Sequence, residues 1–567
     1  MQQGYTLSRG IWVALVGVVG FIALLCLVPP VSRDALVHHL AVPKLYIKAG
    51  GMVEIPTMEW SYYPMNLDLL YWACLWFGND ILPKFVHFAF GLGTAVLIYR
   101  YLREKLGGIW GLWGAFVFIS TPIIMKLSTT VYVDLGLAFF SLAATLALFR
   151  CREEGFSGWK RVAWAGVLCG LGLGVKYNGL LILLLLAALV PILVSRTVPK
   201  EGHRDVKAIG FGAVFVIAAL LAYAPTGVRN TVWTGNPIYP LYNGTVQEIM
   251  GVLTEPAKAH AEPVEENVAK PQKTSVRFHP LQLRTIIYGE SPLDVALLPL
   301  RIFFQGRDGN SGLFDGRFSP LLFLFFPLLL LWRRIPDGLR SDVGSLLFVS
   351  WVYIFLAFFL TAVRVRYLVP VVPHLVILSV YGLKHAVDFL KSIAQPVVKN
   401  IGVACLALFI GYGFWVNTAY AAYLYGYVKP LGYLSGKVGR DEYIARYRYE
   451  HDAFQYVNRT LDDTARLYFV YLGKRGYYCD IPYVPDSHGN HLVRLLYRGD
   501  ELRSPGESAD LLRREGITHL VINMNITWPH VTKNGGPGEA ESLSRFLATE
   551  TTQVFNSRGV HVFAVKK

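Results

Sequence analysis

Long apolar stretches recur along most of this 567-residue chain. A helix needs about 20 consecutive apolar residues to cross the hydrocarbon core of a bilayer. The runs lie at about 10–30, 81–100, 108–125, 133–150, 162–176, 179–195, 208–228, 318–332, 343–362, 367–388 and 401–424. The sequence therefore predicts a polytopic α-helical membrane protein with about eleven transmembrane helices.

The composition agrees with a membrane protein. Hydrophobic residues make up 53% of the chain and charged residues 16%, and the mean hydropathy is +0.40, which excludes a single soluble domain. The first run is too long for a cleaved signal peptide, so we expect a retained anchor. The net charge is +15, from 54 basic against 39 acidic residues. In a membrane protein this excess indicates cytoplasmic loops and anionic lipid, and we expect no nucleic-acid partner.

The basic loops predict the topology. The run at 64–78 is short and carries Asn66 and Asp68. If it lies in the interface and does not span, every basic cluster falls on one side of the membrane, as the positive-inside rule favours. These clusters lie at about 100–105, 150–161, 196–207, 333–340 and 384–399. We therefore expect interfacial helices over about 35–78, a cytoplasmic N-terminus and an extracytoplasmic C-terminus.

The chain divides into a predicted membrane domain, 1–428, and a predicted extracytoplasmic α/β domain, 429–567. A long outer loop is expected at about 229–317, with a mobile middle at 255–273. In the second domain, helical periodicity at 441–461, 508–515 and 540–549 alternates with strand-like segments at 465–471, 518–523, 552–555 and 560–565. This alternation predicts a small, partly parallel sheet. No glycine-rich phosphate fingerprint accompanies it, so its expected task is to cap the outer cavity or to meet an acceptor.

Charged residues at the outer ends of the runs are the candidates for function, since an ionisable group in hydrocarbon is costly. They are Asp34, Asp134, Lys176, Arg229 and the Arg364/Arg366 pair. Each has a structural alternative: Asp34 as a helix cap, Asp134 as an acid favoured by the helix dipole, Lys176 as a snorkelling lysine and Arg366 as an interfacial anchor. Together, acids and bases at one depth suit a phosphate-bearing, sugar-carrying lipid.

His38 and His39 raise the alternative of a metal site with Asp34. Two adjacent histidines on a helix point about 100° apart, so they do not easily share one ion. We assign no metal ligands and no cofactor, with a divalent metal left as the open alternative.

An ordered series of short motifs resembles a known superfamily. Asp34 follows the first run, and Tyr62-Tyr63-Pro64 begins the second of the expected interfacial helices. Asp134 opens the fourth run, and Val175-Lys176-Tyr177 lies at the break between two later ones. A further run begins with Arg366-Tyr367-Leu368-Val369-Pro370-Val371-Val372-Pro373. In this order the chain resembles bacterial membrane glycosyltransferases of the GT-C superfamily. The nearest branch contains the aminoarabinose lipid A transferase and the protein O-mannosyltransferases. The family's acid-rich first loop is absent, because Ala35 follows Asp34; the sugar and the acceptor therefore stay open.

The resemblance implies transfer of a sugar, with inversion, from a polyprenyl-phosphate donor to an acceptor hydroxyl at the outer face of the bacterial cytoplasmic membrane. Asp34 and Asp134 are the expected catalytic residues, with Asp34 as base. The donor phosphate is assigned to Lys176, Arg229, Arg366 and Tyr367, and further substrate contacts to His38, Lys44, Tyr63 and Asp68. The expected partners are the lipid donor, a lipid, glycan or protein acceptor, and membrane lipids around a monomer. A transporter or a non-catalytic polyprenyl-phosphate-binding protein is the alternative.

Overall fold

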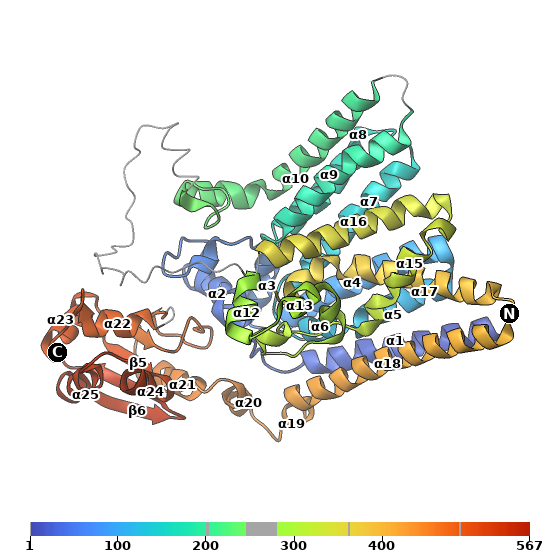
Figure 1. Cartoon of the computed structure of the whole chain (residues 1–567). Helices are drawn as coiled ribbons and strands as arrows, with labels where there is room; N and C mark the ends of the chain where they lie inside the picture. The colour runs from blue at the N-terminus through green and yellow to red at the C-terminus, as the bar shows by residue number, and fades with distance from the viewer. Residues whose placement is uncertain (1, 200–202, 245–279, 361–362, 487–488) are drawn as a thin grey trace.

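A bundle of long helices carries a smaller α/β domain at one end (Figure 1). The computed structural model describes residues 2–199, 203–244, 280–360, 363–486 and 489–567. The predicted mobile segment 255–273 lies outside the described residues. In the membrane part the helices are α1 (Gln2–Cys26), α2 (Ala41–Lys48), α3 (Asn66–Trp76), α4 (Leu82–Leu106), α5 (Gly108–Ser120), α6 (Pro122–Ser128), α7 (Asp134–Glu153), α8 (Trp159–Leu173), α9 (Gly179–Thr197), α10 (Arg204–Thr234), α12 (Pro280–Tyr288), α13 (Pro292–Ala296), α14 (Leu298–Phe304), α15 (Phe326–Leu330), α16 (Asp337–Leu360), α17 (Val372–Ser392) and α18 (Pro396–Val428).

Every predicted apolar run is helical over most of its length, but not every run gives a full span. Among the described residues, eight helices are long and apolar enough to cross a membrane, and a ninth span results if the bent pair α5–α6 counts as one. These two helices meet at a 66° bend. The runs predicted at 162–176 and 318–332 form the 15-residue α8 and the shorter helical segment Pro320–Leu330. The multi-pass helical fold is confirmed, whereas the count of eleven spans exceeds the helices that reach full length.

The segment between the first two long helices is built from short helices, as predicted. A π-helical turn, η1 (Ala35–His39), is followed by α2, a 3₁₀ turn, η2 (Glu59–Tyr62), and α3. Helix α3 has 11 residues, about 16 Å at the α-helical rise, which is roughly half the hydrocarbon thickness. A helix of this length does not cross a bilayer by itself.

Close helix packing depends on glycine at several contacts, as is common in membrane bundles. A Cβ on Gly170 of α8 would lie 2.1 Å from the Ala219 carbonyl oxygen of α10, and one on Gly166 would lie 2.3 Å from the Phe215 oxygen. Helices α8 and α10 therefore touch backbone to backbone at these positions. Helices α1 and α18, from opposite ends of the membrane part, also lie side by side (Figure 1), and the rings of Phe21 and Tyr425 are 6.5 Å apart.

The basic loops converge at the end of the bundle away from the α/β domain (Figure 1). Arg150 pairs with Glu104 at 3.2 Å, and Arg152 pairs with the fully buried Asp342 of α16. Three of the clusters used to predict the topology thus share one end, with acids interspersed. Their shared position agrees with the positive-inside argument, and the direction of insertion stays a prediction.

After α18 the chain forms α19 (Pro430–Leu434), α20 (Arg440–Tyr447), α21 (His451–Thr460), α22 (Asn490–Leu496), α23 (Pro505–Arg514), α24 (Met524–Lys533) and α25 (Glu539–Glu550). The strands are β1 (Leu467–Val470), β2 (Tyr483–Val484), β3 (Tyr497–Arg498), β4 (Glu501–Leu502), β5 (His519–Asn523), β6 (Thr551–Ser557) and β7 (Val560–Val565). The main sheet has the order β2-β1-β5-β7-β6, with β2, β1 and β5 parallel. The predicted partly parallel sheet is confirmed; the two-residue strands β2, β3 and β4 were not predicted, because they are too short to show alternation.

Candidate functional site

Asp34 lies at the start of η1, and its carboxylate does not cap that turn. Instead Oδ2 accepts a hydrogen bond from Arg366 Nη1 at 2.5 Å. Arg366 belongs to η6 (Val365–Val371), more than 330 positions later in the chain. Burial by itself would raise the pKa of the Asp34 carboxyl, but the Arg366 guanidinium holds that pKa well below its usual range. The structure therefore rejects the helix-cap alternative and presents Asp34 as an ionised carboxylate.

Asp134 and Lys176 form a second ion pair. Lys176 Nζ donates to Asp134 Oδ1 at 2.6 Å, and the Asp134 side chain is 4% exposed. Asp134 stands in the first turn of α7, where an acid is favoured. His87 accepts the adjacent Leu135 amide through Nε2 at 3.0 Å, so the start of α7 is fixed from α4. Lys176 lies in the break between α8 and α9, as the motif predicted.

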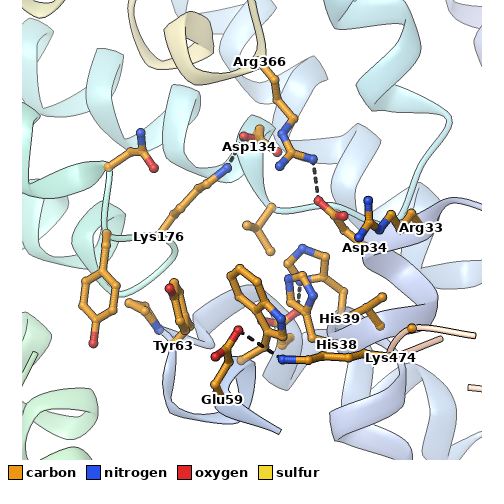
Figure 2. A pocket seen from close by; sticks show the side chains of 18 of the residues that line it. Arg33, Asp34, His38, His39, Glu59, Tyr63, Asp134, Lys176, Arg366 and Lys474 are labelled. Atoms are coloured by element: carbon orange, nitrogen blue, oxygen red, sulfur yellow. Dashed lines mark hydrogen bonds and ion pairs between the residues drawn. The ribbon is translucent and has the colours of Figure 1, made fainter. Parts of the chain in front are cut away.

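The two ion pairs face one cavity of about 730 Å³ (Figure 2). Tyr367 lies between its two main cations: the Lys176 ammonium is 5.6 Å and the Arg366 guanidinium carbon 5.7 Å from the ring centroid. Both distances are within the range of a cation–π contact. Asp34, Asp134, Lys176 and Arg366, predicted from four distant segments, thus meet around one space.

An aromatic wall closes another side of this cavity. The ring of His38 stacks on Trp60 at 5.2 Å, and Trp60 lies 4.8 Å from Tyr63. Burial and the adjacent His39 lower the pKa of His38, so this ring is neutral at pH 7. His39 Nδ1 is bonded to the buried Asp68 Oδ1 at 2.7 Å. Burial, with Glu59 nearby, raises the pKa of Tyr63 to about 12, so its hydroxyl keeps its proton.

Two predicted ligands have other contacts. Arg229 is part of α10, and its Nη2 donates to the carbonyl oxygens of Tyr62 and Tyr63 at 2.8 and 2.9 Å. Lys44 donates to the Tyr477 carbonyl at 2.6 Å. Among the described residues, neither of these two basic side chains belongs to the cavity wall. Their position near the outer face was predicted from the sequence, but the direction of their side chains was not.

Sequence reasoning also missed residues that the fold brings to the cavity. They are Arg33, Glu59, Trp60 and Lys474. Arg33 directly precedes Asp34, so its position was visible in the sequence. Arg364, predicted together with Arg366, does line the cavity. Lys474 belongs to the α/β domain and had no sequence signal. His38, His39 and Asp34 all line the cavity, but in the described part of the chain no cluster of His, Cys, Asp and Glu has the arrangement of a metal site.

A second cavity, of about 450 Å³, lies on the other side of the Asp34–Arg366 pair. Arg33, Asp34, Arg364 and Arg366 line both cavities. Five tyrosines line the second one: Tyr132, Tyr423, Tyr427, Tyr443 and Tyr447. Asp34 therefore lines both cavities.

Comparisons with known proteins place this fold in a class. Residues 75–225 match the sequence model of the dolichyl-phosphate-mannose-protein mannosyltransferase family. None of the curated protein sequences matches the chain. The crystal structure of ArnT from Cupriavidus metallidurans in the apo state has 15% sequence identity, covers 98% of each chain and gives a TM-score of 0.55. The same protein bound to undecaprenyl phosphate has 14% identity over 100% of this chain and 98% of that one, also at 0.55.

A further similar structure is the Archaeoglobus fulgidus oligosaccharyltransferase tethered with an acceptor peptide. It has 10% identity, covers 98% of this chain and 74% of that chain, and gives a TM-score of 0.53. At such identities these likenesses concern the fold. The chain is a multi-pass membrane protein with a GT-C fold and a sheet-containing C-terminal domain. The resemblance predicted from its motifs is confirmed.

Proposed function

We propose that this protein transfers a sugar from a polyprenyl-phosphate donor to an acceptor hydroxyl, with inversion, at the outer face of the bacterial cytoplasmic membrane. The acceptor oxygen forms a bond to the anomeric carbon as the bond from that carbon to the phosphate oxygen breaks. The acceptor proton moves to Asp34, and the polyprenyl phosphate leaves with the electron pair. A base on the face opposite the leaving group gives inversion.

The leaving phosphate needs fixed positive charge and no general acid. Lys176 and Arg366 supply that charge on either side of the Tyr367 ring. The planar guanidinium has five N–H donors, so Arg366 is able to hold Asp34 and a phosphate oxygen together. Asp134 keeps the Lys176 ammonium in place. Arg229 acts indirectly, because it holds the backbone carbonyls of Tyr62 and Tyr63.

The observation that carries the proposal is the meeting of two carboxylate–cation pairs at one cavity. Both pairs use side chains at helix ends or in the segments between helices. Transporters place their polar groups near the bilayer midplane. The proposed donor class is also supported by a protein of similar fold, ArnT, which has been crystallised with undecaprenyl phosphate.

The test is purification of the lipid-linked sugars that accumulate in a strain lacking this protein, followed by mass spectrometry and reconstitution. The purified protein in lipid vesicles should convert the accumulated donor into a glycosylated acceptor and free polyprenyl phosphate. Binding of the donor without any turnover would indicate the lipid-binding alternative. A strain that accumulates no lipid-linked sugar would contradict the proposed donor class.

A further inference from the structure

The loop that follows strand β1 of the α/β domain faces the cavity. Strands β2, β1 and β5 are parallel, and β1 lies between the other two. The chain passes from β1 to β2 on one side of β1, and the later strand β5 lies on its other side. The strand order therefore reverses at β1, which makes this position a topological switch point. Ligands of open α/β sheets bind outside the carboxyl ends of the strands at such a point. Here Tyr471, Gly473 and Lys474, which follow β1, line the cavity that holds Asp34.

The loop after β1 has a defined conformation. Tyr471 has a φ of 54°, in the left-handed region that is costly for a side-chain-bearing residue. Its amide donates to Asp486 Oδ2 at 2.7 Å, and Asp486 is 1% exposed. A Cβ on Gly489 would lie 2.5 Å from the Tyr471 ring, so only glycine fits there. A buried carboxylate and a close glycine contact thus hold this loop in place.

The following residues fasten the loop to the segment that carries Asp34. The Tyr477 amide donates to the Leu36 carbonyl at 3.2 Å, and the Tyr478 hydroxyl donates to the Pro30 carbonyl at 2.7 Å. These two acceptors flank Asp34 in the sequence. Tyr477 is also part of the buried apolar cluster of the interfacial helices. Lys474 therefore has a fixed position relative to the reacting carboxylate.

Lys474 meets Glu59 of η2 across the cavity from Lys176 and Asp134 (Figure 2). The Lys474 ammonium lies 3.2 Å from Glu59 Oε1, and its side chain is 16% exposed against 55% for Glu59. The aromatic pair Trp60 and Tyr63 lies beside Glu59 in the sequence and lines the same cavity. A carboxylate accepts hydrogen bonds from hydroxyls, an ammonium donates to them, and aromatic rings pack on the C–H face of a sugar.

The charges distinguish the two ends of the cavity. Around Asp34 and Asp134 the cations are in excess: Arg33 and Arg364 join Lys176 and Arg366. At the other end Lys474 is paired with Glu59, and Asp486, which holds the Tyr471 amide, is a further acid of the wall. This end therefore has no excess of positive charge for a second phosphate. It instead offers a donor, an acceptor and an aromatic surface, which together match an uncharged array of sugar hydroxyls.

We infer that Lys474 and Glu59 form the subsite that recognises the transferred sugar, so that the C-terminal domain contributes directly to donor selection. This inference rests on the proposed function and names the part of the donor that this end of the cavity binds.

The experiment compares two kinds of lipid on the full-length protein in nanodiscs. The probes are undecaprenyl phosphate and a panel of undecaprenyl-phosphate sugars that carry mannose, glucose, galactose or 4-amino-4-deoxyarabinose. Wild-type protein should bind one sugar-bearing lipid more tightly than the bare lipid. Lys474→Met should reduce this preference about tenfold, in line with the loss of one charge-assisted hydrogen bond, and leave binding of the bare lipid unchanged. Lys176→Met should weaken both kinds of lipid.

Two controls separate recognition from domain docking. Lys48, near Asp480 in the same interface, lies outside the wall of this cavity among the described residues, and Lys48→Met should change neither affinity. The exchanged pair Glu59→Lys with Lys474→Glu keeps an ion pair across the interface but reverses the donor and the acceptor. It should not restore the preference for the sugar.

Each contrary result has its own meaning. Restoration by the exchanged pair, or an equal effect of Lys474→Met on both lipids, overturns the inference. So does a wild-type protein that binds every probe equally, and in that case the proposed lipid-phosphate site still stands. A wild-type protein that binds none of the lipids instead removes the proposed function.

Discussion

The environment of Asp34 depends on a partner that is distant in the sequence. On sequence it is an acid before a short helix, a position where acids commonly act as caps. In the structure its carboxylate makes no cap bond and is bonded to Arg366. Two cavities reach it. The contact that orients Asp34 therefore comes from a distant segment of the chain and not from its own helix.

Asp34→Asn should reduce the rate of transfer by on the order of 10²-fold or more, since a general base typically contributes that much. The substitution keeps the shape of the side chain and removes the proton-accepting oxygen. Single-turnover product formation measures the effect, with thermal unfolding as a check on the fold. Asp134→Asn is the comparison, and we expect a strong but smaller loss. Near-wild-type turnover by Asp34→Asn would reject the assignment of the base.

The pH dependence follows from the lowered pKa of Asp34. A carboxyl with a depressed pKa stays ionised as the pH falls, until the pH reaches that pKa. The pH dependence of kcat/KM reports the ionisation of groups in the free enzyme. It should therefore show no loss due to Asp34 between pH 7 and about 4, the usual Asp value. An acidic limb with a midpoint near pH 6 in a pH–rate profile would show that another group controls the reaction.

At the scale of elements, helix breaks position the site. Lys176 lies in the five-residue interval between α8 and α9, 174–178, and Arg366 belongs to η6, directly before α17 begins. Helix α8 is itself held against α10 by glycine contacts. The position of Lys176 thus depends on how α8 packs against α10.

Gly170→Ala should destabilise the protein by about 1–3 kcal/mol, the usual cost of overpacking, because the added methyl would meet the Ala219 carbonyl oxygen at 2.1 Å. Thermal unfolding in detergent measures the change. Gly210→Ala in α10 is the matched control, since a Cβ there has no neighbour within 4 Å. Equal melting temperatures for the two variants would contradict close packing of α8 on α10.

At the scale of the whole molecule, the two ends of the bundle have different tasks. One end gathers the basic loops, and the other carries the α/β domain (Figure 1). The larger cavity is lined by residues of both the bundle and that domain. The domain is joined to the bundle through Arg440–Asp80, Lys474–Glu59 and the Tyr477 and Tyr478 contacts. The active-site candidate is therefore shared by both parts of the chain.

The topology predicts opposite accessibility for two exposed positions. In a background without native cysteines, Lys533→Cys in the α/β domain should react with a membrane-impermeant maleimide in right-side-out vesicles. Arg103→Cys, at the basic end of α4, should react only after the membrane is opened. Mass-shift labelling on gels measures both. The reverse pattern would place the cavity on the cytoplasmic face.

The sequence by itself determined the membrane class, the positions of the helices and the main strands of the second domain. These depend on local properties: the length of an apolar run and the period of its polarity. It also marked Asp34, Asp134, Lys176 and Arg366, because a charge at the end of an apolar run is visible without any knowledge of its partner.

Only the tertiary structure decided how those charges pair and which side chains face the cavity. Arg229 and Lys44 have the same kind of sequence position as Lys176, yet one supports the loop at Tyr62 and the other holds Tyr477. Lys474 enters the cavity from a domain whose docking no local pattern encodes. The direction of a side chain and the contact between distant segments depend on packing across the whole molecule, and a single sequence carries no local signal for either.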